Sequence, residues 1–348
     1  MIWIQSLVHT YRRYRTLQTD KISALPVVIL MPHSACNCRC VMCDIWKDNK
    51  NLKQLTEQDI TALLDSFKKF GTQQVVMSGG EALLNPNFFR FCEIVRKENI
   101  NVTLLTTGLS LKNHAEQIID CVNDIIVSLD GDQPTHDMIR NIPGAFDKLK
   151  DGIEAIRSLD PNYKITGRTV IHRLNFINWI SIINAAKELK LNQISFLPAD
   201  VSSHAFNRQT AWSEPKQNEI LIAENELPVL KEVVDKVIKI AEANPGLIAE
   251  SSEKLGHIYF YYAAFYGLNA FPYKKCNAPW VSAVIEADGS VRPCFFHEAI
   301  GNIREDDLST VLNNDKAMSF RKSLQVDKNS TCIKCVCSLN LHPATKLI

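Results

Sequence analysis

The chain has 348 residues, and 39 Lys and Arg against 38 Asp and Glu leave a net charge of +1. This balance argues against a nucleic-acid-binding protein, which needs a basic surface to displace phosphate counterions. The longest apolar run, residues 24–31, is interrupted by Pro26, and it is far shorter than the roughly 20 residues that cross a bilayer. We therefore expect a cytoplasmic protein with no transmembrane segment and about two domains.

The cysteines are numerous and clustered. The chain has 11 of them, an odd number, which argues against a closed set of disulfides. Four lie within residues 36–43 and three within residues 332–337. Because disulfides are rare in intracellular proteins, this clustering favours metal binding.

Short apolar runs alternate with helical patterns along most of the chain. Strands are expected at residues 27–31, 74–77, 102–105, 125–129, 165–171 and 194–197. Helices are expected at residues 55–71, 85–95, 115–119, 146–156, 179–186 and 228–243. This alternation predicts an α/β fold, an open partial (β/α)6 barrel over residues 25–245. Functional residues of such a sheet lie at the carboxyl ends of its strands.

The two ends of the chain differ from this pattern. Residues 1–24 form an N-terminal amphipathic extension, in which Ile4, Leu7, Val8 and Tyr11 share one helical face. That face suits either a membrane surface or, more simply, packing against the barrel. Residues 246–348 contain an aromatic run and a hairpin signal at residues 287–290, which predict a second, smaller α+β domain.

The first cysteine group, Cys36-x3-Cys40-x2-Cys43, directly follows the first expected strand. Three thiolates suit an iron–sulfur cluster or zinc. A structural zinc site needs a fourth ligand, whereas three cysteines leave one metal position open for chemistry. Cys38 lies too close in sequence to Cys40 to bind comfortably beside it, so we expect it to be a bystander.

Together with Gly79-Gly80-Glu81 after the second strand, this motif resembles the radical S-adenosylmethionine (SAM) superfamily. The resemblance implies a 4Fe-4S cluster on the three cysteines, with SAM bound at the open iron. It also implies reductive cleavage of SAM to a 5′-deoxyadenosyl radical, which abstracts hydrogen from a substrate. An electron donor such as flavodoxin or ferredoxin is implied as a partner.

The same resemblance implies a set of SAM-binding residues: Gly79, Gly80, Glu81, Thr107, Ser128, Arg140 and Leu197. The two glycines would let the backbone approach the methionine end of SAM. Glu81 would bind its ammonium group, while Arg140 and Ser128 would bind its carboxylate. Thr107 would contact the ribose, and Leu197 would pack on the adenine.

The second cysteine group comprises Cys276, Cys294, Cys332, Cys335 and Cys337. On ligand types alone, zinc and an iron–sulfur cluster are equally good interpretations. The tail resembles the shortened auxiliary-cluster domain, called SPASM/twitch, that is appended to many radical SAM enzymes. The resemblance implies one auxiliary 4Fe-4S cluster on the first four of these cysteines. Cys337 is then an alternative ligand, a spare thiol or a hydrogen-atom donor.

Candidate substrate-binding residues follow the fifth and sixth strands: His172, Arg173, Asp200, Asn207 and Arg208. Such a polar rim would hold a zwitterionic or sugar-like group, and a solvated loop explains it nearly as well. The pattern does not identify a catalytic side chain.

We therefore expect a radical SAM oxidoreductase or maturase that acts on a natural product, either a small metabolite or a peptide. The auxiliary cluster would assist oxidation or bind the substrate. A peptide maturase would need a separate recognition partner, because only about 25 residues precede the first strand. A non-catalytic iron–sulfur or zinc scaffold or sensor is the alternative of another class. The glycine pair and Arg140 argue against it, because a sensor needs no SAM site.

Overall fold

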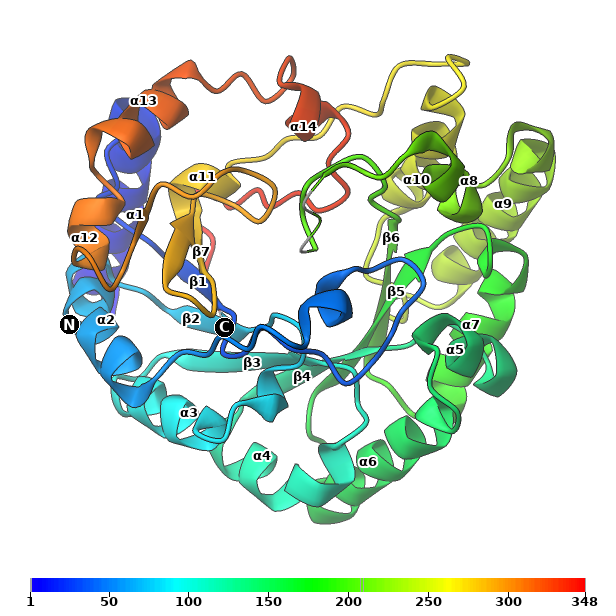
Figure 1. Cartoon of the computed structure of the whole chain (residues 1–348), viewed down its shortest axis with the longest axis horizontal. Coiled ribbons are helices and arrows are strands. Elements are labelled where there is room, and N and C mark those ends of the chain that lie inside the picture. The colour runs from blue at the N-terminus through cyan, green and yellow to red at the C-terminus, as the bar shows by residue number, and fades with distance from the viewer. Residues whose placement is uncertain (1, 207, 209, 348) are drawn as a thin grey trace.

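A computed structural model describes residues 2–206, 208 and 210–347. In this part of the chain one nine-stranded sheet has the order β6-β5-β4-β3-β2-β1-β7-β8-β9 (Figure 1). The strands are β1 (Val27–Leu30), β2 (Gln74–Met77), β3 (Asn101–Thr106), β4 (Asp124–Ser128), β5 (Ile165–Ile171), β6 (Gln193–Pro198), β7 (Ser282–Ile285), β8 (Ser290–Arg292) and β9 (Gly301–Asn302). Strands β1 to β6 pair in parallel in chain order, which confirms the expected partial barrel.

Helices that connect these strands surround the outer side of the curved sheet (Figure 1). They are α2 (Glu57–Phe70), α3 (Phe88–Lys97), α4 (Ala115–Cys121), α5 (Gln133–Arg140), α6 (Ala145–Leu159) and α7 (Trp179–Glu188). Next come α8 (Glu214–Ile220), α9 (Leu227–Ala243), α10 (Ser252–Ala264), α11 (Ala278–Val281), α12 (Leu308–Val311), α13 (Asp315–Ser323) and α14 (Ser330–Ile333). Short 3-10 helices are η1 (Ile45–Asp48), η2 (Ala82–Leu84), η3 (Leu111–His114), η4 (Phe176–Asn178) and η5 (Glu224–Glu226).

Helix α2 shows how local sequence sets these elements. Thr56 and Asp59 form a reciprocal capping box at its start, and Gly71 ends it in the left-handed conformation with φ 62°. Both signals satisfy backbone groups that a helix end leaves unpaired. Its apolar residues, such as Leu63 and Phe67, are buried against the sheet. The predicted start and stop of this helix are confirmed.

Helix α10 was not anticipated as a helix, because aromatic residues dominate it. Its Tyr262 hydroxyl donates to the carbonyl oxygen of Ile171 at the end of β5 and accepts from the amide of Ala199 at 3.0 Å. These contacts join a segment beyond residue 245 to the ends of β5 and β6. The domain boundary expected between residues 245 and 246 stays a prediction.

Strand β7 extends the parallel sheet on its other side. It pairs in parallel with β1, with Val28 opposite Ala283. The expected hairpin is confirmed, since β7 and β8 are antiparallel and Gly289 has φ 85° in the turn. The smaller C-terminal region therefore shares the barrel's sheet.

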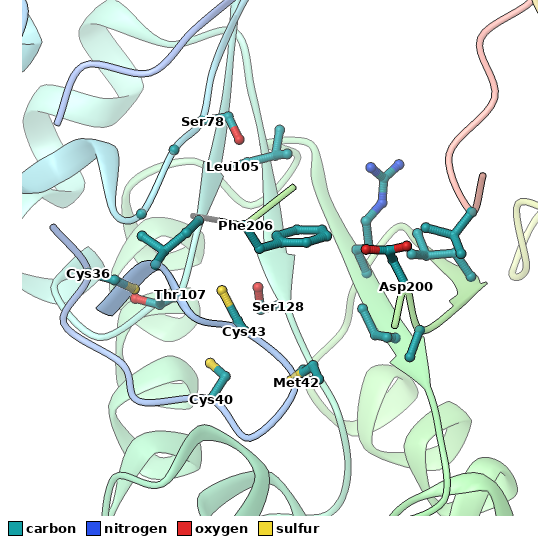
Figure 2. A pocket seen from close by; sticks show the side chains of 18 of the residues that line it. Cys36, Cys40, Met42, Cys43, Ser78, Leu105, Thr107, Ser128, Asp200 and Phe206 are labelled. Atoms are coloured by element: carbon teal, nitrogen blue, oxygen red, sulfur yellow. The ribbon is translucent and has the colours of Figure 1, made fainter. Parts of the chain in front are cut away.

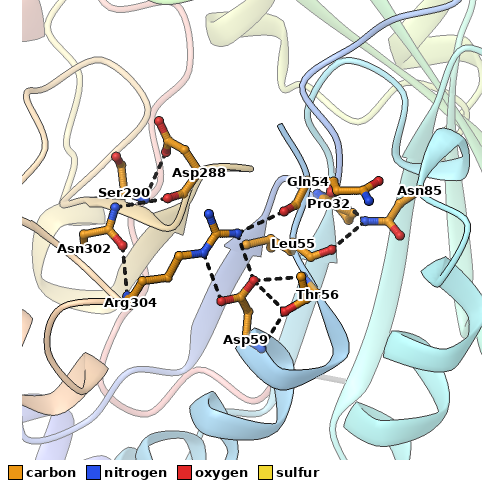
Figure 3. A network of polar contacts seen from close by, with 10 residues as sticks. All are labelled: Pro32, Gln54, Leu55, Thr56, Asp59, Asn85, Asp288, Ser290, Asn302 and Arg304. Atoms are coloured by element: carbon orange, nitrogen blue, oxygen red, sulfur yellow. Dashed lines mark hydrogen bonds and ion pairs between the residues drawn. The ribbon is translucent and has the colours of Figure 1, made fainter. Parts of the chain in front are cut away.

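Arg304, after β9, joins the C-terminal region to the start of α2 (Figure 3). Its guanidinium donates to both carboxylate oxygens of Asp59, at 3.1 and 2.9 Å, and to the carbonyl oxygen of Gln54 at 3.0 Å. Asp59 also accepts from the Thr56 amide at 2.8 Å. One carboxylate thus caps α2 and binds the C-terminal region.

The N-terminal helix α1 (Ile2–Thr19) packs beside α11, and just after its end the Asp20 carbonyl oxygen accepts from Arg321 of α13 at 2.5 Å. Polar contacts hold it: buried Arg13 donates to Gln73 Oε1 at 2.7 Å and to the carbonyl oxygen of Thr345 at 2.5 Å. Leu7 and Tyr11, on the face expected to be apolar and packed, are 67% and 64% exposed. Among the described helices, none is both long and apolar enough to cross a membrane.

Candidate functional site

The loop that carries the first cysteine group runs from β1 to α2. The side-chain amide of Asn85 donates to the carbonyl oxygens of Pro32 at 2.7 Å and Leu55 at 3.0 Å (Figure 3). Both ends of the cysteine loop are therefore held at one point, beside the end of β2.

The glycine pair after β2 lets the same loop approach closely. A Cβ on Gly80 would lie 2.1 Å from the carbonyl oxygen of Ala35, and Gly79 has φ 116°. The amide of Glu81 donates to that same oxygen at 2.9 Å. Only a residue without a side chain fits such a contact, so Gly80 makes room for the cysteine loop itself.

Cys36, Cys40 and Cys43 line one cavity of about 240 Å³ at the carboxyl ends of the strands (Figure 2). Six of the predicted SAM-binding residues line it too: Gly79, Gly80, Thr107, Ser128, Arg140 and Leu197. Cys38 is only 1% exposed and is not among the described lining residues. The structure thus brings the predicted set together, with Cys38 outside it.

The three thiols differ in acidity. Burial raises the pKa of Cys36 and of Cys43 to about 12. A hydrogen bond with Cys38, with help from the nearby Arg140 cation, instead lowers the pKa of Cys40. Iron binds thiolates, so Cys40 is the thiol most ready to receive it.

Arg140 is the cation of this cavity, and its partner was not predicted. Its Nη2 pairs with the buried Asp130 carboxylate at 2.5 Å, and its Nη1 lies 3.5 Å from Cys40 Sγ. Its Nε is buried without a hydrogen-bond partner among the described residues. Because buried polar groups are normally paired, this guanidinium is suited to bind a further anionic group.

Glu81 lies behind the cavity and is fully buried. Its carboxylate accepts from Thr106 Oγ1 at 2.9 Å, from Thr107 Oγ1 at 2.7 Å and from two backbone amides. These donors occupy the oxygens that the sequence assigned to the ammonium group of SAM. In this structure Glu81 holds the end of β3, and direct contact with SAM stays a prediction.

The predicted substrate residues are divided by the structure. Asp200 lines the 240 Å³ cavity and Arg208 a second cavity of about 390 Å³, and the two pair at 2.6 Å. His172 is fully buried and lines neither, and burial lowers its pKa to about 3. Arg173 instead pairs with Glu226 at 3.0 Å.

Chain geometry explains the last two positions. Strand β5 ends at Ile171, and the His172 amide then donates to Asn175 Oδ1 in a turn that leads into η4. Both residues are therefore carried away from the cavity. Asn207 lies outside the described residues.

Cysteines of the second group lie near one another. Burial, and then the charges of Cys332 and Cys276, raise the pKa of Cys294 to about 12. Cys335 lies close enough to Cys294 and Cys337 for their charges to act on its pKa, which is raised mainly by burial. Among the described residues, no three metal-ligating side chains converge on the position of a single ion.

Two residues connect the two groups. Phe295, next to Cys294, and Val336, between Cys335 and Cys337, both line the 240 Å³ cavity of the first group. Phe206 lines it as well (Figure 2). Its ring centroid lies 5.0 Å from that of Phe295. These apolar residues carried no functional signal in the sequence, because their meaning depends on the fold.

Comparisons with known proteins agree with this geometry. A family model described as the radical SAM superfamily matches residues 30–187. A second, for the SPASM iron–sulfur cluster-binding domain, matches residues 276–336 and ends before Cys337.

Similar proteins include two from Methanosarcina barkeri (strain Fusaro / DSM 804). An Fe-coproporphyrin III synthase is 25% identical over 91% of this chain and 83% of its own. An AdoMet-dependent heme synthase is 29% identical, but the match covers 45% of each chain, less than half of that relative. The crystal structure of Streptococcus suis SuiB bound to precursor peptide SuiA has the same fold, with a TM-score of 0.66, 17% identity, and coverage of 93% and 73% of the two chains.

The described residues fit the cofactors of these families. Three thiols face one cavity beside an arginine with an unpaired buried nitrogen, and further thiols converge in the matched SPASM range. The chain therefore contains a radical SAM domain and a C-terminal SPASM domain, which bind a 4Fe-4S cluster with SAM and auxiliary iron–sulfur clusters.

Proposed function

We propose that this radical SAM enzyme takes a hydrogen atom from a natural-product substrate held between its two cysteine groups. When bound by Cys36, Cys40 and Cys43, the 4Fe-4S cluster supplies the electron that splits SAM into methionine and a 5′-deoxyadenosyl radical. One observation carries the proposal: Phe295 and Val336, neighbours of the second group, line the cavity of the first. Substrate bound there would contact both regions.

Residues around the cavity support a SAM seat. The Arg140 guanidinium, fixed by Asp130, would pair with the methionine carboxylate, and Ser128 would donate its hydroxyl to the same group. Thr107 would contact the ribose and Leu197 the adenine. Each of these side chains follows or ends a strand or helix that packing holds rigidly, which suits a preorganised site.

The second cavity would hold the substrate. Its volume of about 390 Å³ lies within the range of small-molecule sites. It shares Gly79, Gly80, Phe206 and Phe295 with the 240 Å³ cavity. A substrate in it would therefore reach the position where the radical forms.

The charges in its wall favour a neutral or zwitterionic substrate. Each of three cations already has a carboxylate partner: Lys53 with Asp288 at 3.1 Å, Arg292 with Glu286 at 3.0 Å, and Arg208 with Asp200 at 2.6 Å. A substrate with several carboxylates would need unpaired cations. A small metabolite is thus the first candidate, and a peptide segment presented by a separate partner is the second.

One auxiliary 4Fe-4S cluster on Cys276, Cys294, Cys332 and Cys335 completes the proposal. It would accept the second electron of an oxidation or anchor the substrate. Electrons for SAM cleavage would come from flavodoxin or ferredoxin. Cys40 also lines a third cavity, of about 620 Å³, together with Arg39 and Lys47, and this side would suit such a donor.

The test is formation of 5′-deoxyadenosine by anaerobically reconstituted protein with SAM and a chemical reductant, followed by chromatography. The wild type should form it, and Cys40→Ala should abolish it because one cluster ligand is lost. Cys38→Ala is the matched control from the same loop: it removes a hydrogen bond to Cys40 but no proposed ligand, and it should retain much of the product. Wild-type protein that holds iron but forms none, or a Cys40→Ala protein that still forms it, would contradict the proposal.

A further inference from the structure

The imidazole of His297 lies against a cysteine of the second group. Its Nε2 is 3.3 Å from Cys332 Sγ. The ring packs edge-on against Phe320, with centroids 4.9 Å apart, and the His297 carbonyl oxygen accepts from Arg292 Nη1 at 2.9 Å. Side-chain packing and a backbone contact therefore hold this ring in place.

Cys332 is held from its other side as well. Asn329 caps α14, and its Oδ1 accepts from the Cys332 amide at 3.1 Å. A thiolate that binds iron can only accept hydrogen bonds, so in the loaded protein Nε2 of His297 carries the hydrogen. The geometry then gives an N–H donor directed at a ligand sulfur.

His297 also faces the proposed substrate cavity. With Thr331 and Phe296 it lines the 390 Å³ cavity. None of the other described residues that line this cavity has a side chain hydrogen-bonded to a cysteine of the second group. The ring thus lies between the cavity and Cys332.

From this geometry we infer that His297 is a positioning residue for the auxiliary cluster. The hydrogen bond from His297 to Cys332 raises the reduction potential of that cluster. Hydrogen bonds to ligand sulfurs stabilise the more negative, reduced state of a cluster. A higher potential makes the cluster a better electron acceptor for whatever is bound in the adjoining cavity. The inference rests on the proposed assignment of Cys332 as a ligand, and it adds a residue that the proposed function does not require.

The test is a redox titration followed by electron paramagnetic resonance, in the Cys40→Ala chain so that the auxiliary cluster titrates alone. His297→Ala should leave the iron content unchanged and lower the midpoint potential. A change of up to about tenfold in the reduction equilibrium is expected, which is ~59 mV for one electron. His297→Gln keeps an N–H at the same reach and should restore much of the potential.

His342→Ala is the control, because His342 is exposed in the same region and contacts the Ala344 amide instead. An unchanged midpoint in an iron-loaded His297→Ala protein would overturn the inference and leave the proposed function intact. Loss of the cluster in His297→Ala would also overturn it, because it would make His297 a ligand. If Cys332→Ala instead held as much iron as the wild type, Cys332 would not be a ligand of the auxiliary cluster, and the inference would lose its basis.

Discussion

The two cysteine groups, which border the same cavity differently, are also assembled differently: the thiols of the first line it, whereas the second reaches it only through the neighbouring Phe295 and Val336. The proposed ligands of the first lie within eight residues of one loop, which contacts Asn85 and Gly80 after β2. Those of the second are spread from Cys276 to Cys335, on segments that only the folded sheet brings together. The first site is therefore set by local chain geometry, and the second depends on tertiary structure. Iron binding at the second should be coupled more strongly to folding.

Acidity sets one thiol of the first group, Cys40, apart from its neighbours Cys36 and Cys43 and from the second group. Cys40 has a lowered pKa, because Cys38 and Arg140 stabilise its thiolate. In the second group, burial raises the pKa of Cys294 to about 12 and of Cys332 to about 11. At neutral pH the first group thus offers iron a more available thiolate than either of these two.

The largest expected effect is on iron content. Reconstituted wild-type protein should hold about eight irons, four for each cluster. Cys332→Ala should reduce this to about four and leave SAM cleavage partly intact, because the first group does not depend on it. Iron analysis measures the loss of the second cluster, and the 5′-deoxyadenosine assay measures the SAM cleavage that remains. Unchanged iron would remove the auxiliary assignment, and loss of all iron would show that the two sites are not separable.

Arg140→Ala should have the next largest effect, on the free energy of unfolding. It leaves the fully buried Asp130 carboxylate without its 2.5 Å partner, and breaking a buried pair costs about 3–5 kcal/mol of unfolding free energy. Denaturant unfolding of the chain without iron measures this. The double variant Asp130→Asn/Arg140→Ala is the control and should recover part of the loss. SAM binding to the loaded protein should be weakened in both, and full affinity would clear Arg140 of that role.

The pH dependence of iron loading should differ between the groups. Raised thiol pKa values mean that protons must leave before iron binds, so loading should improve as pH rises from 7 to 9. Each pH unit raises a protonated thiol's thiolate fraction about tenfold. Iron loading of Cys40→Ala reports the second group, and that of Cys332→Ala reports the first. Loading should rise more steeply with pH in Cys40→Ala than in Cys332→Ala. Equal slopes would contradict the difference in acidity.

The smallest expected effect comes from Arg304→Ala. It removes the contact between the C-terminal region and the capping carboxylate of α2, and the exposed pair is worth ~1 kcal/mol or less. The change should appear as faster proteolysis within the C-terminal region. Arg90→Ala is the matched control, since Arg90 of α3 forms an exposed pair with Glu57 of α2, both outside the C-terminal region. Equal proteolysis of both variants would show that Arg304 does not hold the region in place.

Local patterns were sufficient for much of the fold. The start at residues 55–59, the apolar spacing after it and Gly71 predicted α2, and the turn at residues 287–290 predicted the β7–β8 hairpin, because each depends on a few neighbouring residues. The pairing of β7 with β1 was not predicted, since it joins residues more than 250 positions apart and no local pattern encodes it. Helix α5 was not predicted either, because its sequence is mostly polar and lacks an apolar helical pattern.

The candidate site was predicted where it depended on strand ends and spacing. Six of the seven predicted SAM-binding residues line one cavity with the three cysteines, because parallel strands bring their carboxyl ends together. Glu81 and Arg173 are directed elsewhere by partners that the sequence does not reveal. The pairing of Asp130 with Arg140 and the contact of His297 with Cys332 were not predicted, because only the folded chain brings these residues together.

The most direct test of the open-iron site uses the reduced Cys332→Ala protein, which retains only the first cluster. Its electron paramagnetic resonance spectrum should change shape when SAM is added, because SAM would bind the iron that the three cysteines leave free. The same spectrum with and without saturating SAM would contradict the account.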